Sequence, residues 1–334
     1  MTDKITLLAG DVGGTKTLLS LWTKENERPH PLIIERYRTA DYLEFNELLA
    51  TFVHQHCQKL NLGAVTLGTA GPIGKGVCQL TNVGWQLSAA DIAKSLDLPT
   101  NRVRLLNDVE AMGHAVGVLR QDEIETLQVG SWRPNGNAAI IALGTGLGET
   151  VLQRTVSGFR PIATEAGHSD FAPRTPLGIE LLKSLTDRFG RASLENVLSG
   201  PGLTHIHDLM HSDTRCHGVL HPRSEPVRPE EVTASAMGNK CEQCVRTLDL
   251  FVEVLAAETG NLGLRSLATA GIYIAGGIAP NILPKLKSET FLATFLAKAP
   301  MEQLMSELPI HVVLNPYTGL LGAAIIAAEL ATEQ

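Results

Sequence analysis

Two stretches of the sequence combine an apolar strand, a turn of glycine and threonine, and a second apolar strand. The first, LLAGDVGGTKTLLSLW at 7–22, places an aspartate, Asp11, beside the turn. The second, AAIIALGTGLGETVLQR at 138–154, repeats this plan. Glycine backbone and a threonine hydroxyl can bind phosphate, and a nearby carboxylate can bind a metal ion. A glycine pair is also an ordinary hairpin turn, but its recurrence favours phosphate binding by duplicated halves.

Four further residues, at two places in the sequence, are of types that could take part in catalysis or binding. Asn107 and Asp108 stand where the strand in VRLLNDVEAMGHAVGV is expected to give way to a helix. Asp108 could cap that helix or act as a base, and the two roles are compatible. Glu165 and His168 lie in TEAGHSDFAP, either as a solvated loop or as ligands for hydroxyl groups.

A third glycine corner occurs in GIYIAGGIAPNI at 271–282, where a strand ends before a helix. It lacks the G-x-G-x-x-G pattern, and the chain lacks the G-x-x-x-x-G-K-[ST] pattern of P-loop proteins. Any nucleotide would therefore be bound in another way, with the two hairpin tips at its phosphates and this corner at its nucleoside.

The elements that must position these residues alternate between strands and helices. This alternation predicts an α/β layer architecture, with functional side chains at strand ends. Apolar spacing predicts a helix over 41–60 with Asp41 as its cap, and the small residues of NPYTGLLGAAIIAAEL predict a closely packed final helix. A length of 334 residues favours two domains.

Composition excludes several classes of protein. The 28 basic and 35 acidic residues give a net charge of −7, which argues against a nucleic-acid or anionic-membrane partner. The N-terminus does not have the pattern of a signal peptide, and no apolar run is long enough for a membrane span. Five scattered cysteines are expected to be free thiols in a reducing, cytoplasmic setting.

The ordered set GDVGGTK, LLNDVEA, LGTGLGET, TEAGHSDFAP, ENVLSGPGL and IAGGI resembles the bacterial glucokinase family of the hexokinase/actin/Hsp70 ATPase superfamily. The resemblance extends from about residue 8 to about residue 325. It implies a duplicated actin-like ATPase fold, ribonuclease H-like in each half, with two α/β domains and an interdomain cleft. The implied domains are a small one, 1–118 plus 313–334, and a large one, 119–312.

The resemblance also implies roles for individual residues. Asn107, Asp108, Glu165, His168 and Glu195 would bind the sugar, with Asp108 as the general base. Asp11 would be the metal ligand. The nucleotide would contact a larger set, in which the last two residues form the adenosine corner: Gly10, Asp11, Val12, Gly13, Gly14, Thr15, Gly144, Thr145, Gly146, Gly148, Gly276 and Gly277.

The activity implied by the resemblance is ATP-dependent phosphorylation of glucose at its 6-hydroxyl, with Mg²⁺ as cofactor, giving glucose 6-phosphate and ADP. A kinase for another hexose or a hexosamine, or a non-catalytic sugar sensor on the same fold, is the alternative. The expected partners are glucose and ATP, and a homodimer is left open.

Some residues fall outside this interpretation. Cys241 and Cys244 have C-x-x-C spacing but no second pair, which argues against redox or zinc chemistry and against the zinc-containing repressor/open-reading-frame/kinase group. The histidines of 205–221 and Cys216 are expected in a variable surface loop, with metal binding as the lesser alternative. Trp85 is expected in the core or a pocket wall rather than stacked on a sugar.

Overall fold

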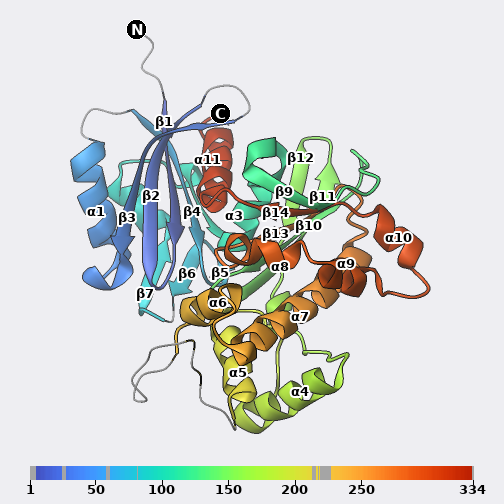
Figure 1. Ribbon diagram of the computed structural model, residues 1–334. Helices are drawn as coiled ribbons and strands as arrows, with labels where there is room; N and C mark the ends of the chain where they lie inside the picture. Colours follow the sequence, from blue (N-terminus) through green and yellow to red (C-terminus); the bar gives the residue numbers. More distant parts are fainter. Residues whose placement is uncertain are drawn as a thin grey trace. The chain divides into compact units, whose positions relative to one another are not determined.

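The computed structural model describes residues 5–24, 28–57, 61–80, 82–212, 216, 218 and 227–332. The chain forms two compact units, and Figure 1 labels their helices and strands. Unit 1 comprises Met1–Arg120, Ser157–Ala163 and Tyr317–Gln334. Unit 2 comprises Gln121–Val156 and Thr164–Pro316. His217 and His221 of the histidine-rich stretch lie outside the described residues.

Unit 1 is built from strands and helices that alternate along the chain. Its strands are β1 (Thr6–Val12), β2 (Lys16–Thr23), β3 (His30–Arg38), β4 (Leu62–Thr69), β5 (Ile73–Gly74), β6 (Val77–Leu80), β7 (Trp85–Ser88), β8 (Val103–Asn107) and β12 (Gly158–Ile162). Its α-helices are α1 (Phe45–His56), α2 (Ala89–Ser95), α3 (Asp108–Ala115) and α11 (Thr318–Leu330).

The main sheet of unit 1 has the strand order β3-β2-β1-β4-β8. The hairpin partners β1 and β2 are antiparallel, whereas β1, β4 and β8 run parallel to one another. Because both faces are covered, these strands are nearly continuous apolar runs, as in TLLAGDV of β1. On one face, α11 packs against α3 and β4 through buried small residues such as Ala323, Ala324 and Ala327.

Unit 2 contains the second glycine hairpin and most of the helices. Its strands are β9 (Ile124–Gln128), β10 (Ala138–Leu143), β11 (Leu147–Thr155), β13 (Ile272–Ala275) and β14 (Ile310–Val313). Its α-helices are α4 (Pro176–Phe189), α5 (Gly200–Met210), α6 (Pro229–Met237), α7 (Glu242–Ser266), α8 (Leu283–Leu286), α9 (Glu289–Leu296) and α10 (Glu302–Glu307).

The strands of unit 2 repeat the plan of unit 1. They lie in the order β11-β10-β13-β14-β9, with β10 and β11 antiparallel and β10, β13 and β14 parallel. The strands β1, β4 and β8 of unit 1 therefore correspond to β10, β13 and β14 of unit 2. The predicted α/β fold with duplicated halves is confirmed.

The start of α1 differs from the sequence prediction. The helix begins at Phe45, and Glu44 is its N-cap without a side-chain hydrogen bond. Asp41 instead belongs to a 3₁₀ turn, η1 (Thr39–Asp41). The buried Thr39 donates its hydroxyl to the carbonyl of Gly13 at 2.8 Å, so this segment supports the first hairpin and cannot join the helix.

Other expectations about the fold are confirmed. Trp85 is 2% exposed and packs against Phe45 in the core of unit 1. None of the five cysteines forms a disulfide. None of the helices in the described part of the chain combines the length and apolarity that a bilayer span needs.

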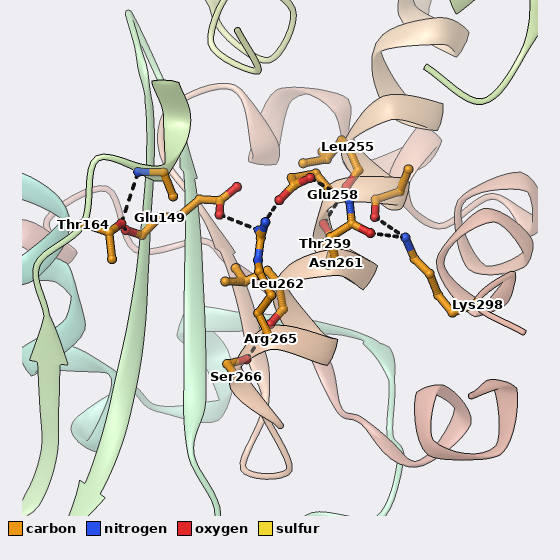
Figure 2. Close-up of polar contacts among 12 residues, drawn as sticks. Glu149, Thr164, Leu255, Glu258, Thr259, Asn261, Leu262, Arg265, Ser266 and Lys298 are labelled. Carbon is orange, nitrogen blue, oxygen red and sulfur yellow. Dashed lines mark hydrogen bonds and ion pairs between the residues drawn. The ribbon is translucent and has the colours of Figure 1, made fainter. Parts of the chain in front are cut away.

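A charged network with two buried glutamates and a half-exposed arginine connects β11 to the long helix α7. Figure 2 shows Arg265 between the carboxylates of Glu149 and Glu258, with its Nη2 atom 3.1 Å from Glu149 Oε2. Both glutamates are 3% exposed. Asn261 donates to Glu258 at 2.9 Å and accepts from Lys298. Burial, together with the negative charge of Glu258, raises the pKa of Glu149 to about 8, and Arg265 opposes this shift.

This network makes unfolding stability depend on pH. The folded-state pKa of Glu149 lies above its ordinary value of 4.5, so the folded chain holds a proton that the unfolded chain releases. The resulting stabilisation is present below that ordinary value and is lost as pH rises through about 8. Between these values, wild type should lose up to about 1 kcal/mol of unfolding free energy per pH unit relative to Glu149→Gln.

Urea denaturation of both proteins from pH 5 to about pH 8.5 measures this difference. Glu180→Gln, an exposed change on α4, is the control and should follow wild type. Parallel pH curves for wild type and Glu149→Gln would contradict the assigned pKa.

Candidate functional site

Three of the predicted sugar ligands gather in unit 2. His168 ends a short 3₁₀ turn, η5 (Ala166–His168), and Glu165 is the residue before that turn. The Nε2 atom of His168 lies 4.0 Å from Glu165 Oε2, and its Nδ1 atom lies 3.9 Å from Glu195 Oε1. The side chains are 56%, 67% and 34% exposed for His168, Glu165 and Glu195, so each remains accessible to a ligand.

Backbone hydrogen bonds hold the Glu195 segment against this turn. The N–H of Glu195 donates to the carbonyl of Gly167 at 2.9 Å, and the N–H of Leu194 donates to that of Ser169 at 2.8 Å. The two segments are close because the chain folds back through α4, not because they are neighbours in sequence. These backbone hydrogen bonds therefore fix the position of the Glu195 segment relative to the η5 turn.

Glu195 also connects this group to the second glycine hairpin. Its Oε2 atom accepts a hydrogen bond from the N–H of Leu147 at 3.0 Å. A Cβ atom at Gly146 would lie 2.5 Å from the same oxygen, so only glycine allows the carboxylate to rest on the turn. One oxygen of Glu195 thus fixes its position, while the other faces His168.

The third glycine corner adjoins the second hairpin. Strands β10 and β13 are parallel neighbours, with Ala142 paired to Ala275, so their carboxyl ends share one edge. Gly276 has φ +88°, and a Cβ atom there would lie 2.2 Å from the carbonyl oxygen of Leu143. No described atom lies within 4 Å of a Cβ built on Gly144 or Gly277. Backbone at these two positions is open to a ligand.

The first glycine hairpin closes with a hydrogen bond from the N–H of Gly13 to the carbonyl of Lys16 at 3.1 Å. Thr39 supports it from outside through the bond to Gly13 and through its N–H, which donates to Thr15 at 3.2 Å. Neither Gly13 nor Gly14 has a positive φ. The need for left-handed backbone, which is the usual reason for a glycine pair in a turn, does not apply here.

The parallel strands of unit 1 end level with one another. Val12 pairs with Thr69, and Thr69 pairs with Asn107, so Asp11 and Asp108 belong to the same edge of the sheet. Burial raises the pKa of Asp11, and the positive charge of Lys16 opposes that shift. An oxygen donor beside glycine backbone is chemically suited to Mg²⁺.

The junction between β8 and α3 corrects one interpretation from the sequence. The N-cap is Asn107, whose Oδ1 atom accepts from the N–H groups of Val109 at 2.9 Å and Glu110 at 3.4 Å. Glu110 completes a capping box by accepting from the N–H of Asn107. If Asp108 were the N-cap, α3 would start at Val109, but it starts at Asp108. The alternative that Asp108 is the cap of this helix is therefore wrong. Asp108 occupies the first helical position, and its Oδ1 atom accepts from Val109 at 2.8 Å.

The remaining predicted nucleotide-binding residues lie on the two hairpins. Gly10 and Val12 are in β1, Thr145 is in the turn between β10 and β11, and Gly148 is in β11. Sequence reasoning missed the supporting residues Thr39 and Leu147. The only local signal for Thr39 was a threonine directly after a strand, and a backbone N–H such as that of Leu147 leaves no signal in the sequence.

The chain matches the glucokinase family model over residues 8–330. It belongs to the glucokinase family. A glucokinase of Nostoc punctiforme is 36% identical over 345 residues, an alignment that covers 97% of this chain and 99% of the relative. The predicted family and the prediction of an enzyme are confirmed.

Solved structures agree with this assignment. The crystal structure of a glucokinase from an Antarctic psychrotroph has a TM-score of 0.83 at 26% identity and covers 98% of this chain and 100% of its own. That of a Balamuthia mandrillaris glucokinase in complex with glucose has a TM-score of 0.81 at 20% identity, covering 98% and 94%. The actin-like ATPase fold expected for this glucokinase family member is thus confirmed.

The capping box at Asn107 predicts a stability effect that is separate from any role of Asp108. Replacing Asn107 by Ala should lower the unfolding free energy by about 1 kcal/mol, since the N–H of Glu110 loses its side-chain acceptor and that of Val109 keeps only Asp108. Asn107→Asp should stay close to wild type, because aspartate caps about as well as asparagine. Urea denaturation without ligand measures both, and equal stability of the Ala variant would refute the capping role.

Proposed function

We propose that this member of the glucokinase family transfers the γ-phosphoryl group of ATP to the 6-hydroxyl of glucose. The observation that carries the proposal is the group formed by Glu165, His168 and Glu195 on the second glycine hairpin. In this group, side chains that can bind hydroxyl groups lie next to a backbone turn that can approach phosphate.

The chemistry of this group suits a sugar. Each hydroxyl of a hexose loses water on binding and needs both a donor and an acceptor in exchange. The carboxylates of Glu165 and Glu195 are acceptors, while the imidazole of His168 can donate from one nitrogen and accept at the other. Because Glu195 Oε2 is already engaged by Leu147, its Oε1 is the oxygen left to face the sugar.

Asp108 is proposed as the general base. Its backbone position at the strand edge is fixed by the Asn107 cap, so its carboxylate is not required for capping. In the transfer, the 6-oxygen of the sugar forms a bond to the γ-phosphorus as its proton passes to Asp108. The bond from that phosphorus to the bridging oxygen breaks, and ADP leaves with the electron pair. Catalysis is then mainly positioning and charge stabilisation.

The nucleotide is assigned to the glycine hairpins and the third corner. The open backbone at Gly144 and Gly277 would admit phosphate and nucleoside, respectively. Asp11 would hold Mg²⁺ through a carboxylate oxygen, consistent with the preference of this ion for oxygen ligands. When bound, Mg²⁺ supplies neutralisation of phosphate charge.

Asp108→Asn tests the base directly. The variant keeps the side-chain size and a hydrogen-bonding oxygen but loses basicity, so glucose binding should persist while kcat falls by about 10²- to 10⁴-fold. Coupled detection of ADP release measures kcat, and calorimetry measures glucose binding. Asp91→Asn, on the exposed face of α2, is the matched control and should keep wild-type kcat. A near wild-type kcat for Asp108→Asn would refute the mechanism.

Glu165→Ala tests the sugar group. Loss of one acceptor for a buried hydroxyl should weaken glucose binding by roughly 1–3 kcal/mol, which is about 5- to 150-fold in affinity. The same ADP-release assay, run over a panel of hexoses and hexosamines, gives KM for each sugar. Glu180→Ala serves as the control. An unchanged KM for glucose would remove Glu165 from the site, and glucose binding by wild type without ADP release would instead favour a sensor.

A further inference from the structure

Unit 2 holds a cluster of histidines and cysteines that the proposed function does not use. His207 lies in the last turn of α5, and His211 is the C-cap of that helix. Cys241 is the N-cap of α7, and Cys244 lies in its first turn. The fifth member, Cys216, comes from the segment between these helices. None of the five belongs to the proposed sugar or nucleotide groups.

The potential ligand atoms are close together. The Nε2 atom of His211 lies 3.4 Å from the sulfur of Cys241. The sulfur of Cys216 lies 3.9 Å from that of Cys241 and 3.5 Å from that of Cys244. Ligands at the usual Zn–S and Zn–N lengths around a tetrahedral ion are roughly 3.5–3.8 Å apart. These three separations are close to the edges of such a tetrahedron.

His211 is oriented as a metal ligand would be. Its Nδ1 atom lies 2.9 Å from the carbonyl oxygen of His207, and only a protonated Nδ1 can donate to that oxygen. In the neutral ring this places the lone pair on Nε2, the atom that faces Cys241. A second-shell hydrogen bond of this kind commonly fixes the tautomer of a histidine bound to metal.

His207 supplies an independent observation. Its side chain is buried, and its ring stacks on His211 with centroids 4.0 Å apart. Neither of its ring nitrogens has a hydrogen-bond partner among the residues that the structure describes. Its ligand atom lies within 4.8 Å of those of His211, Cys216 and Cys244. The carboxylate of Asp208 is nearby, with its Oδ1 atom 3.8 Å from His207 Nδ1, but this is beyond hydrogen-bond distance. Burying an imidazole without a hydrogen bond is costly, and a nearby ion would offset that cost.

We propose that Cys216, Cys241, Cys244 and His211 bind one zinc-class divalent ion, with His207 closing the site on its buried side. Thiolate and imidazole ligands select zinc over magnesium or calcium. With four protein ligands the coordination is closed, as in structural rather than catalytic zinc sites. The ion would tie the end of α5 to the start of α7. The sequence argument against zinc considered only the Cys241–Cys244 pair, because Cys216 and His211 are distant from it in the chain.

Metal content of the full chain tests the proposal. The protein should be expressed without a polyhistidine tag, dialysed against metal-free buffer and analysed by inductively coupled plasma mass spectrometry. Wild type should retain about one zinc per chain. Cys244→Ser should lose it, and Cys57→Ser, which changes a thiol of unit 1, should keep it. Cys241→His, which replaces one zinc ligand by another, should retain the ion if the variant folds.

Cobalt substitution gives a readout that does not depend on how the variants fold. Zinc is removed from wild type with a chelator, and Co²⁺ is added to the apoprotein. Tetrahedral thiolate ligation should produce visible d–d bands and an ultraviolet thiolate-to-cobalt charge-transfer band. Wild type without zinc and without these bands would overturn the proposal, as would a disulfide between two of the three cysteines in freshly purified protein.

Discussion

The pairing of parallel strands with a glycine hairpin is the constraint on which the site depends. In unit 1 the register sets Val12, Thr69 and Asn107 level, so the residues that end β1, β4 and β8 share one edge. In unit 2, β10 and β13 end level in the same way, beside the second hairpin and the third glycine corner. A shift of one residue would turn the side chains on these strands, such as those of Asp11 and Asn107, to the other face. Register therefore decides which side chains can meet a ligand.

Within unit 2, Glu195 connects the second glycine hairpin to the proposed sugar ligands. The carboxylate is held at one oxygen by Leu147 and can approach the hairpin only because Gly146 has no side chain. Its backbone is in turn bonded to Gly167, beside His168. Glu195 thus contacts both the proposed phosphate hairpin and the proposed sugar ligand His168. A substitution that moves Glu195 would therefore change the geometry of both.

Helix α7 carries polar chemistry at both of its ends. Near its C-terminal end, Glu258 and Arg265 form the charged network that reaches Glu149 on β11. At its N-terminal end lie Cys241 and Cys244 of the proposed zinc site. Between them the helix is buried along most of its length, in the main core of unit 2. Burying the two glutamates costs desolvation that offsets much of their attraction to Arg265, so the network is weak evidence for net stability.

The sequence by itself determined the features that depend on neighbouring residues. Apolar runs interrupted by glycine identified both hairpins, and the order of the motifs identified the glucokinase family and its fold. The sequence also predicted that Trp85 lies in the core or a pocket wall rather than stacked on a sugar. Only the tertiary structure decided that Thr39 holds Asp41 out of α1 and that Cys216 joins Cys241 and Cys244. These depend on approaches between segments distant in the chain, which local periodicity and spacing do not record.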